Sequence, residues 1–139
     1  MSVFKKQVQT EKVQKEVLLQ MFAANEGYAP NVHKIVPGEN GTSVIWMDRV
    51  EGKTLYDLYG DSQYDIPPGL WNRIRLYLQV LYIEYGIQYV DVTPYNFIMD
   101  ENDRLWIIDF GDATIHEKEL NWFLTDFMDG EDAWNTDFA

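Results

Sequence analysis

Two short polar segments at a fixed distance constrain the fold of this chain more than any other feature. Residues 91–96 (DVTPYN) begin with a carboxylate and end with a carboxamide, and residues 109–111 (DFG) start thirteen positions after that carboxamide. Between them, residues 97–99 and 104–108 have the composition of strands and are separated by a polar turn at 100–103. We therefore expect a hairpin that holds the two polar segments at its open end.

The polar side chains of these segments are Asp91, Asn96 and Asp109. Phosphoryl transfer from Mg-ATP needs such a set, because one Asp orients the attacking hydroxyl while an Asn and a second Asp hold the metal ions that neutralise the phosphates. The DFG segment alone would be a weak signal, but the combination at this spacing is specific. The structural alternative is a loop in which Asp91 and Asn96 only cap the backbone.

Helix and turn signals elsewhere predict a small α+β domain. Thr10 is a suitable N-cap for a helix over residues 10–24, whose apolar side chains recur at helical spacing. The Asn40-Gly41 pair is a strong hairpin signal between predicted strands at 32–36 and 43–47. The other predicted elements are a strand at 2–6 and helices at 55–58, 69–85 and 117–128.

Composition bounds the class of protein. With 139 residues, of which 46% are apolar, the chain is long enough for one domain with a hydrophobic core. It contains no Cys, no signal-peptide h-region and no apolar run long enough to cross a membrane. A net charge of −12 with dispersed Lys and Arg argues against nucleic-acid binding. We expect a soluble, cytoplasmic protein without membrane contact.

The order helix, hairpin, connector, helix, polar turn, hairpin and DFG resembles the core of the protein-kinase-like fold. The similarity is strongest for its small atypical branches, the Rio kinases and the minimal kinase of the KEOPS tRNA-modification complex, with aminoglycoside phosphotransferases more distant. Residues 46–55 (WMDRVEGKTL) resemble the strand, hinge and following turn of that minimal kinase, and residues 91–96 resemble its catalytic loop. The resemblance covers about residues 16–113.

This resemblance implies a truncated protein-kinase-like fold in one domain. Residues 1–47 would form an N-lobe remnant of a helix and a hairpin, residues 48–55 the hinge, and residues 56–139 a reduced helical C-lobe with the catalytic hairpin. No Gly precedes Gly27, so the glycine-rich phosphate loop of the family has no counterpart in the sequence. After Ala113 too little chain remains for the helices that bind peptide substrates.

On the phosphate side of the implied site, Asp91 is the catalytic base, and Asn96 and Asp109 ligate Mg²⁺. Lys5 resembles the conserved strand lysine that reaches the α- and β-phosphates of ATP, and Glu16 resembles the helix glutamate that pairs with it. An amino-terminal Lys pair is also common as solvated surface charge, and that alternative stays open for Lys5.

At the adenine end of the implied site, the backbone of Asp48 and Val50 binds adenine, and Met47 lies behind it as the gatekeeper. Ile98 would lie under the adenine ring, and Ile108 directly precedes the metal ligand. The alternative for these apolar side chains is ordinary strand core.

Two further departures from the family concern regulation and the end of the chain. Tyr89 and Val90 stand where the family has the catalytic-loop His and Arg, and almost no activation segment follows Asp112. We therefore do not expect activation by phosphorylation of the usual kind. The chain has an acidic, aromatic end that is predicted to cap the core near Trp106 and Phe110, with docking of a partner as the alternative. The aromatic residues of this end are Trp122, Phe123, Phe127, Trp134 and Phe138.

These residues leave three functions open. The leading one is a miniature ATP- and Mg²⁺-dependent phosphotransferase of the Ser/Thr protein-kinase type, with ATP and a protein substrate as its partners. A pseudokinase would keep nucleotide binding but serve as a scaffold or regulator of a partner protein, and a small-molecule kinase would use a small alcohol as acceptor. A kinase reduced this far is typical of compact viral genomes, which would place it in the host-cell cytoplasm. The acceptor, the organism and the oligomeric state stay open.

Overall fold

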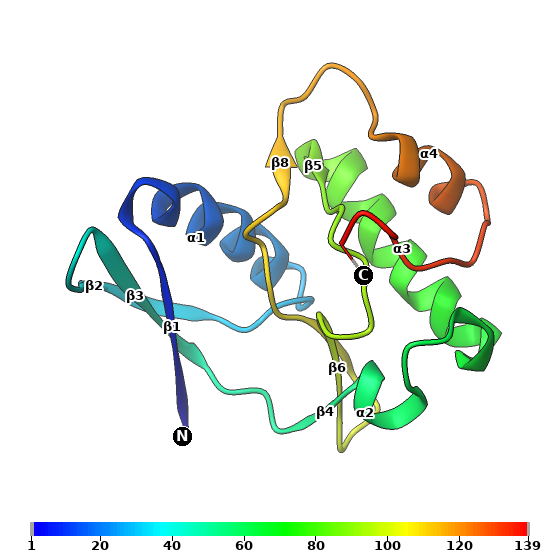
Figure 1. Ribbon diagram of the computed structural model, residues 1–139, viewed down its shortest axis with the longest axis horizontal. Helices are drawn as coiled ribbons and strands as arrows, with labels where there is room; N and C mark the ends of the chain where they lie inside the picture. Colours follow the sequence, from blue (N-terminus) through cyan, green and yellow to red (C-terminus); the bar gives the residue numbers. More distant parts are fainter. Residues whose placement is uncertain (1, 139) are drawn as a thin grey trace.

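The amino-terminal part of the chain is a three-stranded antiparallel sheet with one helix packed on it (Figure 1). The computed structural model describes residues 2–138. Strands β1 (Val3–Gln9) and β2 (Val32–Pro37) flank the central β3 (Thr42–Asp48), and α1 (Thr10–Asn25) covers one face. The predicted Asn40-Gly41 turn joins β2 to β3, and its residues have the positive φ angles, 55° and 73°, that a tight hairpin turn requires.

Helix α1 connects this sheet to the rest of the molecule. Val13 and Val17 pack with Ile45 and Met47 of β3 in a small buried cluster. Leu19, further along the same helix, belongs to the larger core of the carboxyl-terminal half. Because each fully buried aliphatic side chain contributes about 1.5–3 kcal/mol of burial free energy, α1 contributes to the stability of both parts.

The carboxyl-terminal half is built around α3 (Pro68–Tyr85). Pro68 fits the first turn of a helix, where the N–H groups have no helical partner, and Gly86 ends the helix in the left-handed conformation with a φ of 71°. No helix within residues 2–138 is long and apolar enough to span a membrane. The remaining elements are β4 (Gly52–Thr54), α2 (Leu55–Tyr59), a 3-10 turn (Gln63–Asp65), β5 (Ile87–Gln88), β6 (Phe97–Asp100), β7 (Leu105–Ile107), β8 (Thr114–Ile115) and α4 (Trp122–Met128).

The predicted hairpin between the two polar segments forms from β6 and β7, and β4 pairs with the free edge of β6. At its closed end, the Asp100 carboxylate accepts three hydrogen bonds within the turn and the following strand. At its open end, the Ile108 N–H donates to the Asn96 carbonyl at 3.1 Å. The hairpin therefore brings the two polar segments side by side, as the spacing predicted.

Several elements differ from the sequence-based expectations. Strand β1 continues to Gln9 instead of ending near residue 6, and the short strands β4, β5 and β8 were not predicted. Helix α4 begins at Trp122 instead of residue 117, because the Gln88 side chain donates to the Glu119 carbonyl and accepts from the Asn121 N–H, which holds this stretch in an irregular, non-helical conformation. The α+β class is confirmed, whereas the boundaries between remnant lobe, hinge and reduced lobe stay a prediction.

Candidate active site

A cavity of about 310 Å³ lies between the amino-terminal sheet and the β6–β7 hairpin. Its lining includes all of the residues that the sequence assigned to adenine binding and to the metal. They come from three separate stretches of the chain. These predicted residues are Met47, Asp48, Val50, Asn96, Ile98, Ile108 and Asp109. Four other lining residues, Phe4, Lys6, Pro30 and Arg49, were not predicted.

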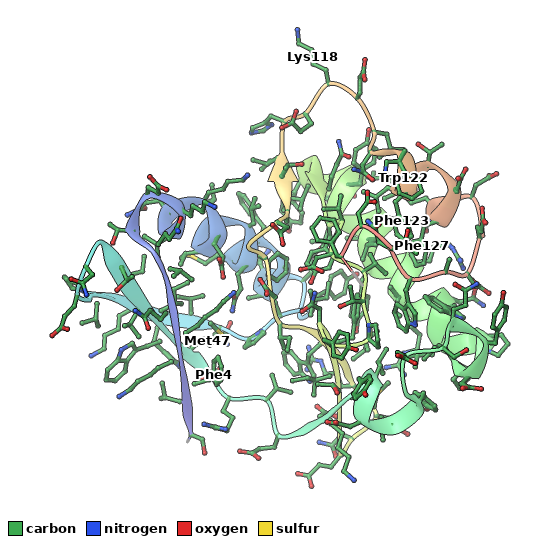
Figure 2. All side chains as sticks on the ribbon, in the orientation of Figure 1. Phe4, Met47, Lys118, Trp122, Phe123 and Phe127 are labelled. Carbon is green, nitrogen blue, oxygen red and sulfur yellow. The ribbon has the colours of Figure 1, made fainter. Side chains whose placement is uncertain are left out.

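One end of the cavity is apolar. Phe4 and Met47 occupy paired positions of β1 and β3, and Figure 2 shows them close together. Ile98 and Ile108 contribute the apolar side chains of the hairpin. Phe4 is 43% exposed although it is a large aromatic residue, so its ring is available to contact a planar ligand. The sequence offered no signal for Phe4, because its position depends on the pairing of β1 with β3.

The predicted hinge presents a backbone donor, the N–H of Val50, beside this apolar end. The Asp48 N–H donates to the Asn31 carbonyl at 3.0 Å, and the Arg49 N–H donates to the Ser2 carbonyl at 3.2 Å. The Val50 N–H makes no backbone hydrogen bond within residues 2–138. Of the two predicted hinge residues, Val50 is therefore the one whose N–H a ligand can use.

The lysine at the polar end of the cavity is Lys6, whereas the sequence pointed to Lys5. Lys6 Nζ lies 2.5 Å from Glu16 Oε2 and 3.0 Å from Asp109 Oδ1. Lys5 Nζ instead lies 4.1 Å from the centroid of the Trp46 ring. Successive side chains of a strand point to opposite faces, so the placement of Lys5 was wrong by one residue. Glu16 pairs with a lysine of this strand, but that lysine is Lys6.

The Lys6 ammonium group is positively charged and lies among acidic side chains. Burial disfavours the ammonium form, but the hydrogen bond to Glu16 and the charges of Asp109 and Glu16 outweigh it and raise the pKa of Lys6 above its ordinary value. Glu16 is itself only 5% exposed. Lys6 therefore stays protonated at neutral pH and places a cation beside Asp109.

Asp91 is buried in the loop next to the polar end. Burial is the main cause that raises the pKa of Asp91 to about 6, and the negative charge of Asp109 adds to it. A hydrogen bond from the Asn96 side chain acts in the opposite direction. Asn96 Nδ2 also donates to the Asp91 carbonyl at 2.9 Å. The structure therefore brings the three predicted polar residues together.

Tyr89 packs against the phenylalanine of the DFG segment from the core. Its ring centroid lies 5.3 Å from that of Phe110 and 6.1 Å from that of Phe97, both in edge-on geometry. Its hydroxyl is buried and has no hydrogen-bond partner within the described part of the chain. Burial first, and then the charge of Asp91, raises the pKa of Tyr89 well above its ordinary value. Tyr89 is therefore a neutral packing residue at neutral pH.

Gly111 permits the close packing of the acidic groups around Lys6. Its N–H donates to Asp109 Oδ1 at 2.8 Å. A Cβ at this position would lie 3.2 Å from the same oxygen and 3.3 Å from Glu16 Oε1. A larger residue would therefore require one or both of these carboxylates to shift slightly.

Asn96 and Asp109, the two predicted metal ligands, both line the polar end of the cavity. No group of three His, Cys, Asp or Glu side chains among residues 2–138 is arranged to hold a metal. Mg²⁺ commonly uses only one or two protein carboxylates, with substrate phosphates and waters as its other ligands. One carboxylate and one amide oxygen therefore fit a metal that is bound together with a nucleotide.

A solved structure shares this fold. The Cydia pomonella granulovirus kinase PK-1 superimposes with a TM-score of 0.66 at 23% identity, over 81% of this chain and 43% of that chain. At this low sequence identity, the likeness supports the α+β, protein-kinase-like fold alone. The chain spans less than half of the length of that kinase.

Two comparisons of sequence agree with the fold. The serine/threonine-protein kinase CHK1 of Saccharomyces cerevisiae is 24% identical over 107 residues, which is 73% of this chain but 20% of the length of CHK1. The RIO domain profile matches residues 3–128, a stretch that includes the hinge and both polar segments. The resemblance to the Rio kinases is confirmed, and the chain belongs to the RIO-domain family of the protein-kinase-like superfamily.

Proposed function

We propose that this chain is an ATP- and Mg²⁺-dependent phosphotransferase that transfers the γ-phosphoryl group of ATP to a hydroxyl group of a protein. The observation that carries the proposal is the convergence of hinge, catalytic loop and DFG segment on one cavity with an apolar and a polar end. A nucleotide has the same division, with a planar base at one end and charged phosphates at the other.

The apolar end is assigned to adenine. Phe4, Ile98 and Ile108 would contact the faces of the ring, with Met47 behind it, and the N–H of Val50 would donate to its edge. Pockets of this kind combine mostly apolar walls with a few polar groups that set the orientation of the ligand.

The polar end is assigned to the phosphates. Lys6 supplies a cation held in place by Glu16, and Asn96 and Asp109 would hold Mg²⁺, which neutralises phosphate charge when it is bound. Asp91 would accept a hydrogen bond from the acceptor hydroxyl and take its proton as the new bond to the γ-phosphorus forms and the bond to the leaving ADP breaks.

The acceptor is proposed to be a serine or threonine hydroxyl of a protein. The support is the similarity to CHK1, named as a serine/threonine-protein kinase, although the chain spans only a fifth of that protein. A small alcohol as acceptor, or nucleotide binding without transfer, are the other outcomes that an experiment has to separate.

The test is transfer of labelled γ-phosphate from ATP with Mg²⁺, to a panel of protein and small-alcohol acceptors. Asp91→Asn and Asp109→Asn should each lower turnover about 100-fold or more, because positioned acid–base and electrostatic groups contribute on that order. Lys6→Met should also lower it, whereas Lys5→Met, on the opposite face of the same strand, is the matched control that should retain it.

Three results would contradict the proposal in different ways. Equal turnover of all variants would show that the catalytic assignment is wrong. Transfer only to small alcohols would show a small-molecule kinase. Thermal stabilisation by ATP that requires Mg²⁺, but no transfer to any acceptor, would show a nucleotide-binding scaffold.

A further inference from the structure

The carboxyl-terminal segment 130–138 returns from α4 to the catalytic loop. Figure 1 shows it running from α4 back towards the middle of the molecule, beside α3. Within it, Asn135 is 1% exposed. Its Nδ2 donates to the Val90 carbonyl at 2.8 Å, and its backbone N–H donates to the Val92 carbonyl at 2.9 Å. Asn135 therefore binds the carbonyl groups of the two residues that flank Asp91.

The loop around Asp91 contains two consecutive tight turns. The Val92 N–H donates to the Val90 carbonyl at 2.8 Å, and the Thr93 N–H donates to the Asp91 carbonyl at 3.0 Å. Each of these bonds closes a three-residue turn, which is a tight reversal of the backbone. The direction of the Asp91 side chain depends on the backbone angles at the centre of the first turn.

The orientation of the Asn135 amide is itself determined by its neighbours. Asn135 Oδ1 accepts from the Asp137 N–H at 3.1 Å, so the amide nitrogen is the atom left to face the Val90 carbonyl. Oxygen and nitrogen of an amide are assigned from the partners they meet, and here both partners agree. The Asn135 side chain thus has one donor and one acceptor, each with a defined partner.

The segment is anchored to α3 independently of Asn135. Trp134 packs on Trp71 with ring centroids 4.5 Å apart, and Asp132 Oδ1 lies 2.5 Å from Arg75 Nη2. Arg75 Nε also donates to the Phe127 carbonyl of α4 at 2.6 Å. The hydrophobic and ionic anchors are therefore on the neighbouring residues, while the two bonds of Asn135 go to the loop of Asp91.

We propose that Asn135 is a positioning residue that holds Asp91 in the geometry for phosphoryl transfer. The inference rests on the proposed function, because Asp91 acts there as the base. Asn135 acts through the Val90 and Val92 carbonyls and does not line the nucleotide cavity. Its loss should therefore affect turnover and leave nucleotide binding intact.

The test compares Asn135→Asp with two control variants in the full chain. Asp keeps the size of the side chain and an oxygen for the Asp137 N–H, but it replaces the donor to Val90 with an acceptor. Thr136→Ala changes an exposed neighbour, and Trp134→Phe weakens the anchor without removing the bonds of Asn135. If Asn135→Asp does not fold, Asn135→Ala tests the same role, since it removes both side-chain bonds and keeps the backbone bond to Val92.

Two readouts are needed, kcat and KM for ATP, and the hydrogen exchange of the amides in residues 90–96. Asn135→Asp should lower kcat about 10- to 100-fold, because small displacements of a reacting group have effects of that size. The KM for ATP should stay within about twofold, as expected when only the transition state is affected. Loop exchange should accelerate in Asn135→Asp, while Thr136→Ala should match the wild type in both readouts.

The outcomes separate this inference from the proposed function. An active wild type, with kcat and loop exchange unchanged in Asn135→Asp, would overturn the role of Asn135 and leave the function in place. Equal losses of kcat in Asn135→Asp and Trp134→Phe would overturn it too, because they would reflect general loosening of the segment. If the wild type transfers no phosphate, faster loop exchange in Asn135→Asp alone would still support the positioning role while the proposed function fails.

Discussion

The two regions that meet at the candidate site are stabilised in different ways. The amino-terminal sheet has a small buried cluster, Val13, Val17, Ile45 and Met47, and it presents Lys6 from the edge strand β1. The carboxyl-terminal half has the main core around α3, and it presents Asp91 from a loop braced by hydrogen bonds. We infer that Asp91 is held rigidly, whereas the position of Lys6 depends on the less stable region.

This difference fits the chemical roles that we propose. A base must be placed within a fraction of an ångström of its proton, because misplacement lowers the rate steeply. A lysine that contacts phosphates acts mainly as a charge, and its long side chain tolerates small shifts of the backbone. Regions with few buried apolar contacts open locally at lower free energy, so the sheet is the part that should move when a nucleotide enters or leaves.

The largest expected effect is a difference between two buried isoleucines. Ile74 of α3 and Ile45 of β3 are both fully buried, one in each cluster. Ile74→Ala should lower the free energy of unfolding by about 4 kcal/mol and Ile45→Ala by about 2 kcal/mol, because a small cluster collapses around a cavity more easily than a large core. Urea unfolding of both variants measures the difference. Equal losses would show that the two regions are equally well packed.

The contrast between the regions also explains how much the sequence could predict. Asp91, Asn96 and Asp109 were found because a local hairpin brings them together, and local spacing is visible in one chain. Lys6 was mistaken for Lys5 because the face of a strand depends on its pairing with β3, and a shift of one residue exchanges the faces. The periodic helices were predicted for the same local reason as the hairpin.

Residues that act through tertiary contacts gave no signal of their role. The Trp134 segment was predicted to cover the core, and it does pack on Trp71, but the bond of Asn135 to Val90 joins residues far apart in the chain. The two-residue strands β5 and β8 are too short to have a pattern. Gln88, which sets the start of α4, likewise acts on residues more than thirty positions away.

An intermediate effect is expected at the closed end of the β6–β7 hairpin. Asp100 Oδ1 accepts from the N–H groups of Asn102 (2.8 Å) and Arg104 (2.9 Å), and Oδ2 accepts from the Trp106 indole (2.9 Å). Asp100→Ala should lower the free energy of unfolding by about 1–2 kcal/mol, a value reduced by the exposure of the turn to water. The neighbouring Glu101→Gln, which changes an exposed charge, is the control and should have little effect.

The same residue predicts a dependence on pH. The hydrogen bond from Trp106 is the main cause that lowers the pKa of Asp100 in the folded protein. A carboxyl with a lowered pKa stabilises the fold above its unfolded value near 4 and loses this contribution as the pH falls through the folded value. The melting temperature of the wild type should therefore fall more steeply below about pH 4 than that of Asp100→Asn. Parallel curves for the two proteins would contradict this.

The smallest effect is expected on the outer face of the amino-terminal sheet. Lys5 and Lys34 place their ammonium groups 4.1 Å and 4.0 Å from the centroid of the Trp46 ring. Cation–π contacts at exposed sites are worth about 0.5–1 kcal/mol, and the two like charges repel each other. We expect about 0.5 kcal/mol of lost stability for Lys5→Ala. The double variant, Lys5→Ala with Lys34→Ala, should lose more than the sum of the single losses, because each single variant also relieves the repulsion between the two charges.

The measurement is a double-mutant cycle by urea unfolding, with nucleotide affinity determined for each variant. Because Lys5 and Lys34 lie on the face away from Lys6, both single variants should bind Mg-ATP as the wild type does, whereas Lys6→Ala should not. If Lys5→Ala weakens nucleotide binding as much as Lys6→Ala, the register of β1 in solution differs from the one that pairs Lys6 with Ile45. A single pair of alanine variants therefore decides which lysine of this edge strand belongs to the site.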